Sequence, residues 1–197
     1  MADLDASGEY LRTDEAEEAV SSLEATAEFL QMTRSDLYRW KWVILALHSA
    51  AQGFMVLALR GGTGLLALQD DVAAAWLTAY ENEKPYPTEK LDSFLNLYKK
   101  VKSDRARLFS HSRSFVPKGT EGRSIRKLNN LRNEFIHFTP KGWSLELAGL
   151  PRVCAETLNM IEFLHRESGN ILLHDENLIG RIDAAIRSIR RSLGNVI

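Results

Sequence analysis

The chain has 197 residues, of which 45% are hydrophobic, and it carries a formal net charge of −1 and a single cysteine. This length and composition predict one globular domain, residues 1–197, with a sizeable core. The lone Cys154 excludes an intramolecular disulfide, so we expect a reducing compartment, the cytoplasm. The N-terminal residues are acidic and contain no apolar stretch, which argues against a signal peptide.

Charge is distributed unevenly along the chain. Residues 1–28 hold nine acidic residues and one arginine, so they carry −8 and the rest of the chain carries +7. Residues 103–127 hold seven basic and two acidic residues, a balance of +5. Such a segment either attracts phosphate groups or is a solvated loop that the acidic segment partly neutralises, and the sequence leaves both interpretations open.

Apolar residues recur with helical spacing through almost the whole chain, which predicts an all-α fold. The Gly61-Gly62-Thr63-Gly64 stretch lacks the preceding strand and the Gly-Lys-Ser/Thr ending of a phosphate loop, so it predicts a helix break. Pro140 disfavours helix at the residue before it, so a helix that starts near Arg123 should end in or beside His137. We therefore expect an up-down bundle of about seven helices, in residues 16–30, 35–59, 65–79, 88–101, 123–137, 151–164 and 178–193.

Three segments are not expected to be helical. Residues 1–9 predict an acidic, flexible N-terminus. Residues 104–122 lack a clean apolar period and predict a long basic loop, and loops of this length are usually functional or mobile. Trp143, Leu145 and Leu147 alternate with polar residues, which indicates a short extended piece.

The stretch from Trp42 to Leu59 contains no formal charge and has the length of a membrane span. His48, Ser49 and Gln52 at its centre would be costly in lipid, so we expect a buried core helix and no membrane contact. His48 and Gln52 lie one turn apart on this helix. They form either a satisfied polar cluster in the core or at a subunit interface, or the lining of a pocket that faces residues 132–137.

Residues 132–137, called the Arg–His segment here, bring an Arg, an Asn and a His together at a predicted helix end. Arg132 is a permanent cation that can hold a phosphate, and His137 can move protons near neutral pH. On an ideal helix, Asn133 and His137 are neighbours, whereas Arg132 lies within the apolar arc beside Ile136. A charge there needs a carboxylate, backbone carbonyls or a second subunit as its partner. The pattern predicts a buried or interfacial Arg beside an accessible His.

The order Arg132-Asn133, three residues, His137, with Phe138 following, resembles the Arg-Asn-x-x-x-His signature of the HEPN superfamily. The resemblance implies a helical bundle that forms homodimers, and a metal-independent endoribonuclease of a toxin, phage-defence or stress type. It implies that Arg132 and His137 are catalytic, that Asn133 supports them, and that two protomers form one composite site. It also implies RNA as substrate, no cofactor and no metal, and a cognate antitoxin or regulatory protein as a further partner.

Two other interpretations stay open. The chain is either a non-catalytic HEPN-fold module for nucleotide, nucleic acid or a protein partner, or an unrelated structural bundle. In the bundle, Arg132 would form a core ion pair and His137 would contact the last carbonyls of its helix. Further candidates for RNA contact are His48, Gln52, His111, Arg113 and Arg126.

Overall fold

The computed structural model describes residues 10–194, so the predicted flexible N-terminus, residues 1–9, lies outside the described residues. The described part contains seven α-helices, two short 3-10 helices and no strand, which confirms the all-α class. The first, fifth, sixth and seventh helices lie within two residues of their predicted bounds. The α-helices are α1 (Glu15–Met32), α2 (Arg39–Arg60), α3 (Asp70–Glu81), α4 (Phe94–Val101), α5 (Glu121–Ile136), α6 (Leu150–Arg166) and α7 (Glu176–Gly194), and the 3-10 helices are η1 (Leu65–Ala67) and η2 (Asp104–Ala106).

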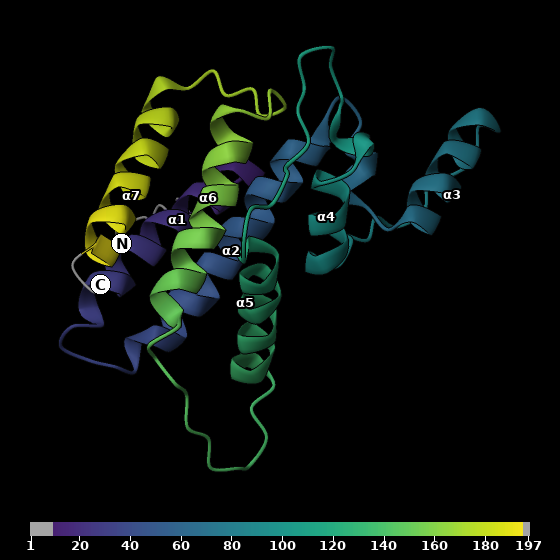
Figure 1. Cartoon of the computed structure of the whole chain (residues 1–197). Coiled ribbons are helices and arrows are strands. Elements are labelled where there is room, and N and C mark those ends of the chain that lie inside the picture. The colour runs from purple at the N-terminus through teal and green to yellow at the C-terminus, as the bar shows by residue number, and fades with distance from the viewer. Residues whose placement is uncertain (1–9, 195–197) are drawn as a thin grey trace, which may run out of the picture.

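Helix α2 runs through the centre of the bundle (Figure 1). Helices α1, α4, α5 and α6 all pack against it, and α7 packs on the outer side of α1. In residues 10–194, α2 is the one helix that is long and apolar enough to cross a membrane, but 61% of its apolar window is buried in the bundle. The buried window supports the prediction that this stretch is a core helix.

Gly53 lets α1 and α2 approach closely. A Cβ atom placed on Gly53 would lie 2.7 Å from Cβ and 3.0 Å from Cα of Ala19 on α1. The second of these atoms is backbone, so α1 itself would have to shift to admit a methyl group. This contact explains a glycine inside the central helix, where glycine costs about 0.5–1 kcal/mol relative to alanine.

Gly53→Ala is expected to lower the free energy of unfolding by about 1–3 kcal/mol, because overpacking outweighs the better helix propensity of alanine. Gly180→Ala is the matched control, since it lies inside α7 and a Cβ atom there would have nothing within 4 Å. The control should raise stability by up to about 1 kcal/mol. Urea unfolding followed by circular dichroism measures both variants. Equal gains in both would contradict the tight contact between α1 and α2.

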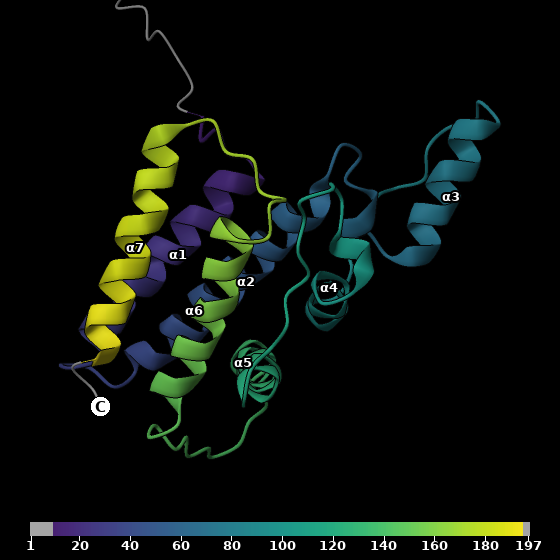
Figure 2. The ribbon, with the colours of Figure 1, turned by 45° about the horizontal axis from the view of Figure 1, so that its top comes forward.

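The prediction of a continuous third helix in residues 65–79 was wrong. Residues 65–67 form η1, and Leu68 then pairs with Leu91 in an isolated antiparallel bridge. Helix α3 begins only after this bridge. The apolar spacing indicated one packed helix, but Ala79 is the only buried residue of α3, and the helix projects from the bundle (Figures 1 and 2).

The starts of the second and fourth helices also differ from the prediction. The fourth helix is capped by Ser93, whose Oγ accepts a hydrogen bond from the backbone N–H of Asn96, and not by Thr88. The bridge holds the chain extended before that point. The second helix begins at Arg39 because residues 33–38 form turns.

The basic loop predicted for residues 104–122 is anchored to the bundle. Asn170, in the connection between α6 and α7, accepts a hydrogen bond from Ser112 Oγ and donates one to the carbonyl of Ala106. Phe115 is buried in the core. These contacts fix the course of the loop along one side of the molecule.

The acidic residues of α1 pair with cations outside the basic loop. Glu15 binds Arg60 at 2.9 Å, and Glu17 and Glu24 both bind Arg181. These ion pairs hold α1 against α2 and α7. The interpretation that acidic residues 1–28 partly neutralise the basic loop is therefore not supported by the described acidic residues of α1. The arginines of the loop pair instead with nearby acids, in the bridges Arg105–Asp70, Arg107–Asp104 and Arg113–Glu167.

Candidate polar site at the C-terminal end of α5

One face of α5 is polar and exposed along its whole length. The opposite face is buried in the core through Ile125, Leu128 and Leu131. Glu134 also lies on the exposed face, but Lys141 binds it at 2.7 Å. We call the exposed residues the polar stripe: Arg123, Arg126, Lys127, Asn130, Asn133 and His137. Its three cations form no salt bridge within residues 10–194, so the stripe is a basic surface that ends at the Arg–His segment.

Arg132 and His137 differ in their surroundings. Arg132 is half-buried, and its Nη1 atom donates a hydrogen bond to Asn133 Oδ1 at 3.0 Å. No carboxylate pairs with Arg132 among the residues that the structure describes, so the interpretation as a core ion pair lacks its partner. His137 is exposed at the C-cap of α5, where its backbone N–H donates to the carbonyl of Asn133. The sequence predicts a buried or interfacial Arg beside an accessible His; in this chain His137 is exposed and Arg132 is half-buried, not fully buried.

A pocket of about 310 Å³, called the motif pocket here, lies where α2, α4 and α5 meet. It brings His48 and Gln52 of α2 to the same cavity as Arg132, as one interpretation of the sequence expected. His137 does not line it. The lining residues are His48, Gln52, Ser93, Phe94, Leu95, Asn129, Arg132 and Asn133.

His48 forms the floor of the motif pocket. Its side chain is buried, its ring stacks on Phe94 with centroids 4.0 Å apart, and its Nε2 atom lies 3.3 Å from Oδ1 of Asn129. Burial lowers the pKa of His48 to about 4, the Asn129 hydrogen bond opposes this shift, and the nearby charge of Arg132 adds to it. His48 is therefore neutral at pH 7 and supplies shape and a hydrogen bond rather than a charge for phosphate.

His48→Gln is expected to flatten the dependence of stability on pH between about 4 and 6.5. The folded-state pKa lies below the unfolded value, so in this window the unfolded chain binds a proton that the folded chain does not bind. His48 should therefore contribute a loss of about 2 kcal/mol on going from pH 7 to pH 5, and the variant should lack this contribution while other buried groups such as His165 act equally in both proteins. Urea unfolding at both pH values tests this. Equal losses in the two proteins would contradict a buried, neutral His48.

The first turn of α4 adds a partial positive charge to the motif pocket. Ser93 caps this helix, and Phe94 and Leu95 follow it at the pocket wall. The N-terminal end of a helix favours anions, and the Arg132 side chain lies in the same pocket. Neither these residues nor Asn129 were predicted from the sequence, although Asn129 lies one turn before Asn133 on the same side of α5. This four-residue spacing from Asn133 could have identified Asn129 as a further site residue.

The remaining candidates for RNA contact are divided between two places. Arg126 belongs to the polar stripe. His111 lies 3.2 Å from the carbonyl of Gly169, and Arg113 binds Glu167. Both are therefore held near the C-terminal end of α6, which lies at the opposite end of the bundle from the C-terminal end of α5 (Figure 1). The structure does not bring His111 and Arg113 to the Arg–His segment.

An apolar groove of about 630 Å³, the aromatic groove, lies on another side of the C-terminal end of α5. Tyr38 and Phe138 are 88% and 53% exposed there. Residues 143–147 form one wall, and their side chains alternate between half-buried and exposed without forming a strand. The lining residues are Leu37, Tyr38, Trp40, Lys41, Phe135, Phe138, Trp143, Leu145 and Leu147.

The described residues offer neither a cluster of metal ligands nor a reactive thiol. In residues 10–194, no three His, Cys, Asp or Glu side chains lie close enough together to hold a metal ion. Cys154 is fully buried, and burial raises the pKa of its thiol to about 12, so it is a core residue rather than a nucleophile. Comparison of the chain with protein-family models, curated proteins and solved structures gave no significant match.

Proposed function

We propose that this chain is an HEPN-like, metal-independent endoribonuclease. The observation that carries the proposal is the polar stripe, where exposed cations without salt bridges in the described residues lead along α5 to Asn133 and His137. An RNA backbone is a row of negative charges, and contacts to phosphates position a nucleic acid without reading its sequence. The stripe therefore supports a track that leads RNA to the Arg–His segment.

The proposed reaction is a transesterification within the RNA chain. The ribose 2′-oxygen attacks the adjacent phosphorus, so that the P–O2′ bond forms and the P–O5′ bond breaks. One proton leaves the 2′-hydroxyl and one reaches the departing 5′-oxygen, and the exposed His137 is suited to take or give one of them. Arg132 would donate hydrogen bonds to the phosphoryl oxygens, and Asn133 orients its guanidinium through the 3.0 Å hydrogen bond.

A second copy of the chain is part of this proposal. His137 does not line the pocket that contains Arg132, so one chain alone presents the two groups to different spaces. Ile136, directly before His137, is 51% exposed and offers an apolar contact to another subunit. We propose that two α5 ends meet there in a homodimer, with one His137 as base and His137 of the second copy as acid. A toxin or defence role, with an antitoxin or regulatory protein as partner, follows from the resemblance alone.

A non-catalytic binding module is the second candidate function. The motif pocket favours it, because Arg132 and the first turn of α4 line a cavity from which His137 is absent. Such a cavity suits the phosphate of a nucleotide or nucleic acid without cleavage. In this alternative, the same residues would bind RNA or a nucleotide as a regulatory signal.

Purified protein should be incubated with an RNA that contains single-stranded loops, in EDTA, and the product ends mapped. The ribonuclease proposal expects 2′,3′-cyclic phosphate and 5′-hydroxyl ends. The control is the same RNA with a 2′-deoxy residue at the mapped site, which lacks the attacking oxygen and should stay intact there. Binding without cleavage would favour the second candidate. The absence of both binding and cleavage would contradict both RNA proposals.

A further inference from the structure

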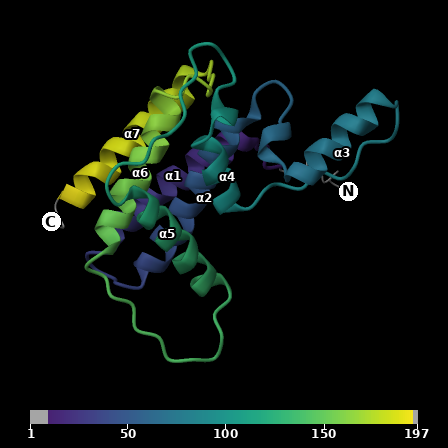
Figure 3. The same ribbon diagram turned by 45° about the vertical axis from the view of Figure 1, so that its right-hand side comes forward.

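Residues 69–90, called the arm here, leave the bundle and return to it with α3 between (Figures 1 and 3). Ala79 is the only buried residue among them. Leu77, Tyr80 and Tyr86 are 49%, 64% and 56% exposed. Apolar side chains gathered on the open surface of a helix are typical of a surface that binds a partner.

The surface of the arm combines an aromatic stack with negative charge. Trp76 lies between two tyrosines, with ring centroids 4.5 Å from Tyr86 and 5.9 Å from Tyr80. Residues 69–90 contain five acidic and two basic residues, a net charge of −3. This surface disfavours nucleic acid and anionic lipid, and it favours a protein surface that is apolar with basic residues at its edge.

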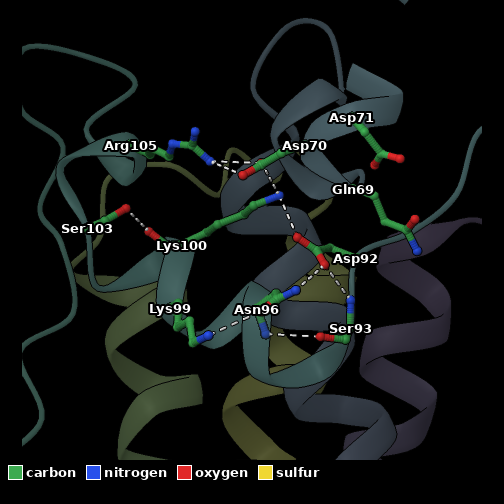
Figure 4. Close-up of a pocket in the computed structure, with 10 residues that line it drawn as sticks. All are labelled: Gln69, Asp70, Asp71, Asp92, Ser93, Asn96, Lys99, Lys100, Ser103 and Arg105. Atoms are coloured by element: carbon green, nitrogen blue, oxygen red, sulfur yellow. Dashed lines mark hydrogen bonds and ion pairs between the residues drawn. The ribbon is translucent and has the colours of Figure 1, made fainter. Parts of the chain in front are cut away.

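The root of the arm is fixed to the bundle (Figure 4). Lys100 of α4 is buried, and its Nζ atom lies 2.7 Å from Asp92, 3.0 Å from Asp70 and 2.6 Å from the carbonyl of Leu68. Arg105 binds the same Asp70 from η2 at 2.8 Å. A polar pocket of about 620 Å³ lies at this root, and its central charges are already paired. These buried ion pairs hold the arm in one direction.

The aromatic groove is the complementary surface on the same chain. It begins at the N-terminal end of α2, and residues 34–41 in and beside it hold three basic residues and one acid. The root of the arm follows the other end of α2. The ion pairs at the root hold the arm so that it projects away from the bundle (Figures 1 and 2), and it therefore does not cover the groove of its own chain.

We infer that the arm of one copy docks in the aromatic groove of a second copy. The apolar residues of both surfaces are then buried, and the acidic residues of the arm beyond Asp70, which is already paired at the root, meet a basic edge. Pairing of arm with arm would bring two negative surfaces together, which disfavours that alternative. The groove and the polar stripe lie on different sides of α5, so this contact does not rest on the proposed ribonuclease function.

Leu77→Glu in the arm and Tyr38→Glu in the groove are each expected to reduce the molar mass in solution by half or more. Both side chains are exposed, so neither change should unfold the chain. Leu172→Glu is the matched control, because Leu172 is 60% exposed in the connection between α6 and α7. Light scattering coupled to size-exclusion chromatography measures the mass. A monomeric wild type, or an unchanged mass in both variants, would overturn the inference.

Cross-linking separates arm-to-groove from arm-to-arm contact. A Leu77→Cys chain and a Tyr38→Cys chain are treated with a short bismaleimide, alone and mixed, and the buried Cys154 stays unreactive. The inference expects a cross-linked pair in the mixture and far less in either chain alone. A pair from Leu77→Cys alone would show arm-to-arm contact and overturn it, as would the absence of any pair.

Discussion

Replacing His137 with alanine is expected to slow RNA cleavage by about 10²–10⁴-fold, the usual contribution of a general acid or base. The imidazole is exposed at the C-cap of α5, so its removal takes away a proton-transfer group without opening the core. RNA binding should change little, because the cations of the polar stripe remain. Single-turnover cleavage in EDTA, with filter binding of the same RNA, measures the two effects separately.

His174→Ala is the matched control for this variant. His174 is exposed in the connection between α6 and α7, remote in sequence from α5. Its loss should leave the cleavage rate and the thermal unfolding temperature unchanged. If His137→Ala cleaves RNA at the wild-type rate, or if both variants lose activity equally, the proposed role of His137 is wrong. An impurity ribonuclease would show the same rate in all three preparations.

The candidate site was predictable where it depends on one helix. A period of 3.6 residues places Asn133 and His137 on one arc and Leu128 and Leu131 on another, and the exposures of these residues follow it. The end of α5 was also predictable from local sequence, because Pro140 disfavours helix at the residue before it. Arg132 lies on the buried arc but near the helix end, so its side chain can reach Asn133 and remain half-buried.

The rest depends on packing between distant segments. The motif pocket needs α2 to meet α5 and α4, and the sequence offered only the polar residues His48 and Gln52 in an apolar helix as a hint. For α3, the apolar spacing correctly indicated a helix with an apolar face. It could not indicate which surface covers that face, so a packed helix was expected where the structure has a projecting arm. The Leu68–Leu91 bridge, which starts the arm, joins residues far apart in the chain.

Lys100→Met is expected to lower the free energy of unfolding by about 3–5 kcal/mol, the cost of leaving a buried charge without its partner. The side chains of Lys100 and Asp92 are 7% and 6% exposed, and both Asp92 and the carbonyl of Leu68 lose a donor in the variant. Lys99→Met is the matched control, because Lys99 is exposed and makes only a 3.5 Å contact with Asn96. Denaturant unfolding should show a change below about 0.5 kcal/mol for this control.

The dependence of the unfolding free energy on pH tests whether Asp92 is the source of the stability lost in Lys100→Met. Burial alone would raise the pKa of Asp92, but hydrogen bonds from Lys100, Asn96 and the Ser93 N–H outweigh burial and hold it below the ordinary value. Its ionised form therefore stabilises the wild type above the unfolded pKa, and this contribution is lost as the pH falls through the folded pKa. In Lys100→Met the same carboxyl can take up a proton at higher pH, so the gap between the two proteins should narrow toward low pH. A gap that is constant with pH would assign the loss to packing of the lysine stem, and not to the ion pair that holds the arm.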